Sequence, residues 1–309
     1  MQTNDLYIFI YENKISIFQN GRVVHYLPQR APPSVLGPQR PGVPATIGFS
    51  ESGQNPPMAS AQQLLQSFDG LLQPERFRDY GPNGLQVEGK DQVQRMVSGV
   101  TASRALIERA ADAGADAIFV HHGLFWRGQD GRVTGWMKQR LALLLGYDIN
   151  LFAYHLPLDA HPELGNNAQF GLKLGLEASA RFGEQDLGFL GARRDGGVFD
   201  TPEQLARHLE GRLGRSTVCV GGDERPLRRI AWCTGGAQGY FEAAIAAGAD
   251  AFITGEISEA QAHYARECGV AFLACGHHAS ERYGAPAVAA HVAAQLGVEH
   301  SFIDIDNPA

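Results

Sequence analysis

The sequence predicts an α/β protein with two similar lobes of mixed sheet flanked by helices, related by internal duplication, and a metal site in the cleft between the lobes. Three observations support this prediction. Strand-like and helix-like segments alternate along the chain, one stretch recurs 134 residues later, and histidines gather at the ends of apolar runs. In α/β sheets, ligands bind beyond the carboxyl ends of the strands.

Residues 1–57 differ in composition from the rest of the chain. Residues 6–10 (LYIFI) and 15–18 (ISIF) have the apolar pattern of two strands, and residues 28–57 have the Pro, Gly and Ser content of a linker. Met58 precedes a segment with helical spacing of apolar residues at 61–68. We therefore expect a domain to begin near Met58. Residues 1–57 are either an extension produced by a misplaced start codon or a hairpin that pairs with a partner.

Residues 95–122 predict a first strand–helix–strand unit. Residues 96–100 (MVSGV) are apolar, residues 103–113 are helix-like, and residues 117–120 (AIFV) form a short buried strand. This strand leads directly into His121 and His122. Parallel strands joined by a helix are the expected arrangement.

A second unit of the same kind is expected near residue 230, and it ends in Gly255 and Glu256. A strand at 229–233 (RIAWC) is followed by an Ala-rich helix at 240–247 and a strand at 251–254 (AFIT). Residues 113–123 (AGADAIFVHHG) align without a gap with residues 247–257 (AGADAFITGEI). We interpret this as an internal duplication that places Glu256 opposite His122. The expected lobes are residues 58–180 plus 291–309, and residues 181–290.

Four further elements complete the expected alternation of strands and helices. Residues 150–155 (NLFAYH) read as a strand and residues 166–174 as a helix. Residues 201–213 read as a helix with Thr201 as its N-cap and a proline in its first turn. Residues 301–306 (SFIDID) read as a closing strand.

Composition narrows the class of function. The net charge is −7 and no cluster of Lys and Arg stands out, which argues against a nucleic-acid partner held through its phosphates. The four cysteines lack C-x-x-C spacing, so neither a disulfide framework nor a thiolate zinc site is expected, and a reducing compartment fits. No apolar run approaches the roughly 20 residues of a membrane helix, and the N-terminus has no signal-peptide pattern. We expect a cytoplasmic protein without membrane contact.

Six of the eleven histidines lie at or just after the ends of apolar runs. A single histidine usually has a structural role, but two His-His pairs and a His-x-x-x-Asp sequence together indicate metal ligands. Neighbouring residues of a regular strand point to opposite faces, so His121 and His122 share a crevice only where the chain turns at Gly123. There they would share one ion or bind two neighbouring ions. The six are His121, His122, His155, His161, His277 and His278.

Two carboxylates are expected to join these histidines. Pro157 favours a loop that brings Asp159 back to the strand end, where Asp159 either binds metal or caps a turn. His277 and Glu281 are four residues apart, so they share a face if a helix begins near residue 278 or 279. Glu281 then either bridges two ions or completes a cap at the helix N-terminus.

The resulting donor set contains three or four imidazoles and two carboxylates, without cysteine. It suits Fe, Mn, Zn, Co or Ni better than Ca or Mg, and does not choose among them. Two divalent ions about 3.5–4 Å apart lower the pKa of a water between them, so hydrolysis is the natural chemistry. Glu281, His155 and His278 are the candidate catalytic residues, and Glu256 is a further candidate at the mouth of the site.

Five motifs in this order resemble the dinuclear-metal proteins called GTP cyclohydrolase 1 type 2 homologs, the Nif-three-like family. The resemblance spans about residues 58–309, and residues 1–57 match nothing in the family pattern. The chain after Leu174 is too short for the large inserted domain of some members. The motifs are residues 79–87 (DYGPNGLQV), 120–126 (VHHGLFW), 154–168 (YHLPLDAHPELGNNA), 254–259 (TGEISE) and 276–284 (GHHASERYG).

The resemblance implies a two-lobed α/β fold, metals in the cleft between lobes and toroidal homohexamers built as trimers of dimers. It also implies metal-ligand roles for the residues singled out above, namely His121, His122, Asp159, His277 and Glu281. The expected function is a metal-dependent hydrolase acting on a nucleotide or related small molecule, GTP cyclohydrolase-like by family name only, since no Walker-type loop or guanine-reading motif occurs. The alternative is a non-catalytic metal carrier or regulatory scaffold.

Overall fold

The computed structural model describes residues 7–11, 14–19, 22–26, 58–223 and 225–309 of the chain, which divides into two compact units, residues 1–55 and 56–309. The first unit contains β1 (Tyr7–Tyr11), β2 (Lys14–Gln19) and β3 (Arg22–Tyr26). These strands form an antiparallel sheet in this order, which confirms strands near 6–10 and 15–18. The linker predicted for residues 28–57 lies outside the described residues.

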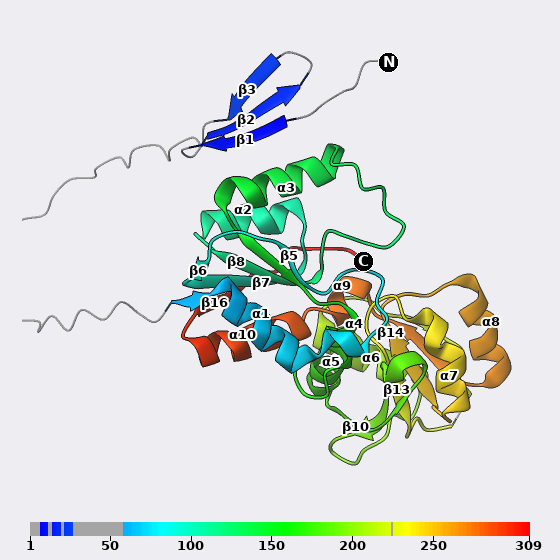
Figure 1. Ribbon diagram of the computed structural model, residues 1–309. Coiled ribbons are helices and arrows are strands. Elements are labelled where there is room, and N and C mark those ends of the chain that lie inside the picture. Colours follow the sequence, from blue (N-terminus) through cyan, green and yellow to red (C-terminus); the bar gives the residue numbers. More distant parts are fainter. Residues whose placement is uncertain (1–6, 12–13, 20–21, 27–57, 224) are drawn as a thin grey trace, which may run out of the picture. The chain divides into compact units, whose positions relative to one another are not determined.

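The second unit is a mixed α/β structure built on two larger sheets (Figure 1). The strands of the first sheet are β5 (Gly84–Val87), β7 (Arg95–Thr101), β8 (Ala117–His122), β9 (Asn150–Ala153) and β16 (Glu299–Phe302). Their order is β16-β7-β8-β9-β5, with all neighbours parallel except β5, which runs antiparallel to β9. A short pair, β4 (Ala59–Ser60) and β6 (Gln92–Val93), lies outside this sheet.

The second sheet has six strands and the same parallel centre. Its strands are β10 (Leu176–Phe182), β11 (Gly188–Arg193), β12 (Val218–Val220), β13 (Ile230–Trp232), β14 (Ala251–Thr254) and β15 (Ala271–Ala274). The order is β10-β11-β13-β14-β15-β12; β13, β14 and β15 are parallel, and the outer pairings are antiparallel. The second sheet thus begins a few residues before the lobe boundary expected at residue 180.

Helices cover both faces of each sheet. The first sheet packs against α1 (Ala61–Leu72) and α10 (Gly284–Leu296) on one face and α2 (Arg104–Asp112) and α3 (Gly135–Tyr147) on the other. The second packs against α5 (Asn166–Leu174) and α6 (Pro202–Leu213) on one face and α7 (Phe241–Ala246) and α8 (Glu259–Cys268) on the other. The short helices α4 (Leu156–Ala160) and α9 (His277–Ser280) follow β9 and β15. Three single 3₁₀ turns occur at Pro74–Arg76, Glu184–Asp186 and Gln238–Tyr240.

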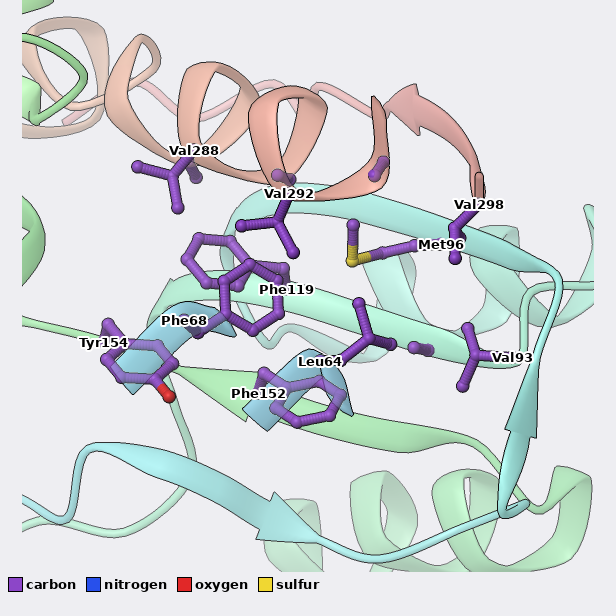
Figure 2. Close-up of a cluster of buried hydrophobic side chains, with 14 of the residues drawn as sticks. Leu64, Phe68, Val93, Met96, Phe119, Phe152, Tyr154, Val288, Val292 and Val298 are labelled. Carbon is purple, nitrogen blue, oxygen red and sulfur yellow. The ribbon is translucent and has the colours of Figure 1, made fainter. Parts of the chain in front are cut away.

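The core of the first sheet follows the two-residue period of its strands. Phe119 of β8 packs with Phe68 of α1, their ring centroids 4.5 Å apart, and with Val292 of α10 (Figure 2). Its neighbours Ile118 and Val120 belong to the cluster on the opposite face, with α2 and α3. Because both faces of β8 are buried, the strand is apolar throughout and its polar side chains occur only at its end, where His121 and His122 lie.

The same contacts occur in both sheets at positions 134 residues apart. Asp116 accepts a hydrogen bond from the backbone N–H of Arg95 at 3.1 Å, and Asp250 accepts one from that of Arg229 at 2.9 Å. In each copy the arginine side chain also donates to the backbone carbonyl three residues before the aspartate, over 2.8 Å. The matching sequence at 113–117 and 247–251 therefore makes matching contacts.

The structure confirms one local expectation and corrects two others. Thr201 caps α6 as predicted, its hydroxyl accepting from the N–H of Gln204. The loop expected around Pro157 is wrong: the segment is the short helix α4, and Pro157 fits its first turn because no N–H is needed there. The closing strand is β16, which ends at Phe302, so the strand predicted at 301–306 is displaced toward the N-terminus.

Among the residues that the structure describes, no helix is both long enough and apolar enough to cross a membrane.

Candidate metal centre

The predicted ligands are brought together by elements from both sheets of the second unit. His121 and His122 end β8, and Asp159 lies in α4, directly beyond β9. His277 begins α9 beyond β15, and Glu281 follows the last residue of that helix. The donors thus lie beyond the carboxyl ends of parallel strands, as expected for α/β sheets.

The carboxylate of Glu281 lies at the centre of three imidazoles. Its Oε1 is 3.4 Å from His121 Nε2, and its Oε2 is 3.3 Å from His122 Nε2 and 3.2 Å from His277 Nε2. The fourth neighbour, Asp159, has Oδ1 3.5 Å from His121 Nε2. His121 and His122 therefore face the same crevice at the end of β8, with ring centroids 4.4 Å apart.

Each of the three imidazoles is held from behind through its other ring nitrogen. Nδ1 of His121 lies 3.2 Å from the carbonyl oxygen of Tyr154, and Nδ1 of His122 lies 3.0 Å from the hydroxyl of Thr101. Nδ1 of His277 lies 2.6 Å from the carboxylate of Glu256. These contacts fix the ring orientations and leave all three Nε2 atoms directed at Glu281, which is the arrangement expected of metal-ligating histidines.

Asp159 is oriented by a buried amide. The side chain of Asn166 donates to Asp159 Oδ1 over 2.9 Å, and its oxygen accepts from the backbone N–H of Gly284 over 2.9 Å. A second donor, the hydroxyl of Thr234, lies 3.5 Å from the same carboxylate oxygen. Asn166 thus connects Asp159 to the start of α10.

The site fits a metal ion, because buried polar atoms at its centre lack partners. His121 is fully buried and Glu281 is only 3% exposed. Among the described residues, His121 Nε2 and Glu281 Oε2 have no hydrogen-bond partner. A buried polar atom without a partner costs about 1–3 kcal/mol, which a coordinated cation would offset. Three overlapping groups of donors could hold ions: His121-His122-His155, His122-His277-Glu281 and His121-Asp159-Glu281.

The pKa values of these carboxylates and imidazoles are set by burial and by their charges on one another. Burial lowers the pKa of His121, but the carboxylates of Asp159 and Glu281 outweigh it and raise that pKa to about 9. Burial lowers the pKa of His122 to about 3, because the attraction of Glu281 is offset by repulsion from the neighbouring imidazoles. The pKa of Glu281 lies well below its usual value, because these imidazoles outweigh the opposing effect of burial. A divalent cation would replace the proton on His121.

His155 lies beside the three central imidazoles and is oriented by a buried aspartate. Its Nδ1 is 2.7 Å from Asp79 Oδ1, and its ring centroid is 4.9 Å from that of His121. Asp79 also accepts from the side chain of Asn83 and the N–H of Leu156, at 2.9 and 2.8 Å. Burial raises the pKa of Asp79, but His155 and these donors lower it further, so the carboxylate stays ionised.

The remaining candidates lie at the edge of the cluster. Glu256 contacts the cluster through His277, as described above, and its carboxylate is 46% exposed. His278 points elsewhere: its Nε2 lies 3.0 Å from Asp304 Oδ1, and it belongs to none of the three donor groups.

Three orienting residues were not singled out from the sequence: Asp79, Thr101 and Asn166. Asp79 and Asn166 lie within the motifs at 79–87 and 154–168, so the motifs carried a signal for them. Thr101 ends β7 and is placed opposite His122 by the parallel register of β7 and β8, a contact that needs the sheet order to be known.

Comparison with known proteins agrees with this architecture. The family model Duf34/NIF3 (NGG1p interacting factor 3) matches residues 59–308. A "GTP cyclohydrolase 1 type 2 homolog" of Neisseria meningitidis serogroup B is 52% identical over 252 residues, covering 82% of this chain and 100% of the relative. The protein of the same name from Escherichia coli K12 is 46% identical, covering 80% and 98%.

Solved structures give the same result. The structure of protein ybgI, described as of unknown function, is 46% identical with a TM-score of 0.77, covering 81% of this chain and 100% of that chain. TTHA1606 from Thermus thermophilus is 31% identical with a TM-score of 0.71, covering 81% and 100%. A Bacillus cereus protein related to NIF3, at 16% identity, a TM-score of 0.71 and coverage of 82% and 99%, shares the fold.

Proposed function

The chain belongs to the Duf34/NIF3 family, and we propose that it is a dinuclear-metal hydrolase acting on a nucleotide or related small molecule. The observation that carries this proposal is the convergence of three histidine Nε2 atoms on the buried carboxylate of Glu281, with each Nδ1 held from behind. The name of its relatives refers to GTP, which supports a nucleotide as the first substrate to test.

Two of the donor groups divide naturally between two ions. His121 and Asp159 would hold one ion, His122 and His277 the other, and Glu281 belongs to both donor groups. Nitrogen and carboxylate donors without a thiolate suit Fe, Mn, Zn, Co or Ni. Divalent ions held there supply Lewis-acid chemistry, lowering the pKa of water so that hydroxide is available near neutral pH.

His155 is the residue of this chain best placed to move a proton. Its Nδ1 lies on the ionised Asp79, so Nδ1 carries the proton and Nε2 is free to accept one. Asp79 would stabilise the imidazolium that results, as a buried carboxylate does beside a catalytic histidine. Glu281 would hold the ions, and His278, which contacts Asp304, would act only by positioning α9.

Elemental analysis combined with a hydrolysis screen tests this function. Protein purified without chelators should hold about two ions per chain, and both Glu281→Gln and His122→Ala should lower that number sharply. His263→Ala, which replaces an exposed histidine of α8 paired with Glu259, is the matched control and should keep both ions. Asp79→Asn should retain the ions and lose turnover. A fully metallated protein inert toward a broad panel of nucleotides and heterocycles would overturn the hydrolase proposal.

A metal carrier or regulatory scaffold is the second candidate, and the exposure of the rim favours it. The side chain of His277 is 28% exposed, whereas His121 is fully buried, so a chelating partner could reach one donor group from solvent. The carrier proposal predicts fast metal loss to a soluble chelator and transfer to an acceptor protein. Retention of the metals for days with no transfer would exclude it.

Three further proposals concern the protein as a whole. We propose that it assembles as a homohexamer, a trimer of dimers, and works in the cytoplasm; light scattering of the purified protein tests the assembly. We also propose that the two sheets arose by internal duplication, supported by the matching contacts of Asp116 and Asp250. The lobes would then be residues 58–180 plus 291–309, and residues 181–290, with the metals between them.

A further inference from the structure

A hollow of about 330 Å³ adjoins the metal centre and is not used by the ligands. Its lining comes from two short segments, residues 79–82 and 125–127. This volume is at the lower end of the range for small-molecule sites, about 300–1,000 Å³. It is therefore large enough for a planar ring system but not for a macromolecule.

The hollow continues inward toward the imidazoles. A narrower space of about 10 Å³, room for about one water molecule, shares residues 81–82 and 125–126 with the hollow and also touches His121 and His155. A molecule in the hollow would thus lie on the side of the metal centre that is formed by His155.

Two aromatic side chains with exposed surface line this hollow, and Trp126 also lines the narrower space beyond it. Trp126 stands edge-on to His155 at a ring-centroid distance of 5.1 Å and lies 6.0 Å from His122. Tyr80 lies 6.1 Å from His155 on the other lining segment and is 60% exposed. An exposed tyrosine beside a half-buried tryptophan offers two planar surfaces for stacking a heterocycle.

The outer part of the hollow carries a positive charge. Arg127 donates one N–H to the backbone carbonyl of Asp79 over 2.7 Å, which holds the side chain in place. No ion pair found among the described residues involves Arg127. The only carboxylate in the lining, Asp79, is almost fully buried and paired with His155, so it does not cancel the charge. A guanidinium held in this way matches the geometry of a phosphate or carboxylate.

We propose that this hollow binds a planar heteroaromatic ring bearing a phosphate, with the ring between Tyr80 and Trp126 and the phosphate on Arg127. This rests on the proposed function, because it assigns the substrate class and orientation for the same centre. The ring is the part that faces the metals, and the phosphate lies at the outer edge. The site therefore presents the heterocycle, and not the phosphoryl group, to the reacting centre.

Binding of GMP and guanosine to the metal-loaded protein tests this arrangement by calorimetry. Tyr80→Leu should weaken both ligands about fivefold or more, because each loses a stacking surface. Arg127→Gln should weaken GMP about tenfold and leave guanosine unchanged, because only GMP has a phosphate for the guanidinium. Trp126→Phe should keep most of the affinity, since an aromatic face remains. Tyr147→Leu, an exposed tyrosine of α3, and Arg212→Gln, an exposed arginine of α6, are the matched controls and should change neither ligand.

The outcomes separate this inference from the proposed hydrolase. Specific GMP binding with no turnover of any substrate would support the proposed binding site in the hollow and exclude the hydrolase function. Turnover whose KM is unaffected by both Tyr80→Leu and Arg127→Gln would overturn the proposed binding site in the hollow and leave the hydrolase function supported. Competition of inorganic phosphate with GMP that persists in Arg127→Gln would place the phosphate on the metals and overturn the proposed orientation. Absence of GMP binding at about millimolar concentration would overturn the inference outright.

Discussion

Substituting Gly235 by alanine should empty the metal centre while leaving most of the fold intact. Gly235 has φ +71°, and an alanine Cβ there would overlap Glu281 Oε1 and lie 3.2 Å from His277 Nε2. The end of a glutamate side chain can move, but it must shift by about 1 Å or more to restore van der Waals contact. That shift breaks the contacts of Glu281 with the three imidazoles at once.

A matched control separates the effect of backbone strain from the effect of the overlap with Glu281. Gly214 has φ +73°, and an alanine Cβ there meets nothing within 4 Å. Both variants carry the strain of a left-handed alanine, about 1–2 kcal/mol, so the Tm should fall by about 2–4 °C per kcal/mol in each. Only Gly235→Ala should also lose metal, with affinity reduced about 100-fold or more, because disturbing even outer-shell partners costs 10–100-fold.

Elemental analysis and thermal unfolding of the two variants, side by side, check this reasoning. Two ions per chain retained in Gly235→Ala would refute the assignment of Glu281 as the shared ligand. Loss of metal in Gly214→Ala as well would show that general strain, and not the overlap, empties the site.

Three other predictions follow from the site and the repeated contacts. Metal binding at about pH 7.5 should release about two protons per chain, from His121 and His277. Burial lowers the pKa of each in the metal-free protein, but the neighbouring carboxylates outweigh burial and raise it to about 9. Calorimetry in buffers of different ionisation enthalpy measures this release, and fewer than about one proton would contradict the prediction. Asn166→Leu should lower the free energy of unfolding by about 2 kcal/mol or more and weaken metal binding, because Asp159 loses a donor and the N–H of Gly284 an acceptor; unchanged urea unfolding would count against it. Burial raises the pKa of Asp116, but Lys90 and two backbone N–H groups lower it further. The ionised carboxylate therefore stabilises the fold above the unfolded pKa of about 3.9, and this stabilisation is lost as the pH falls through the folded pKa. Asp116→Asn should destabilise the protein more at neutral pH than near pH 3, and an equal effect at both would refute this.

The sequence was most informative where local pattern and chemistry coincide. The apolar run 117–120 ending in His121 and His122 predicted both a buried strand and its position at the carboxyl edge of a sheet, and β8 has that form. The spacing of His277 and Glu281 likewise indicated that the two share one side of a helix expected near residue 278 or 279; the helix begins at His277, and Glu281 follows its last residue. Such features depend on a few neighbouring residues, so a single sequence is enough to reveal them.

Contacts between distant segments could not be predicted in this way. Asp79 orients His155 from 76 residues away, and nothing in the local spacing of either residue indicates the pairing. The position of β12 at the edge beside β15 also depends on tertiary packing, because its three residues precede β13 in sequence yet pair with the strand formed about 50 residues later. The helix at Leu156–Ala160 is not evident from the sequence, because proline interrupts most helices but is compatible with the first turn of one.

The two strand ends with matching sequences contribute unequally to the site, and backbone packing explains why. Residues 255 and 256 are the counterparts of His121 and His122 at the offset of 134. At Gly255, any Cβ would lie 2.6 Å from the carbonyl oxygen of Gly235 and 2.6 Å from Cα of His277, so no side chain fits there. This close approach is the same packing that brings His277 to the centre, so a second histidine pair at this strand end would exclude it. Glu256, the counterpart of His122, instead orients His277 through a contact of 2.6 Å. One strand end therefore supplies two imidazoles, and the other supplies the space and the carboxylate that position a third.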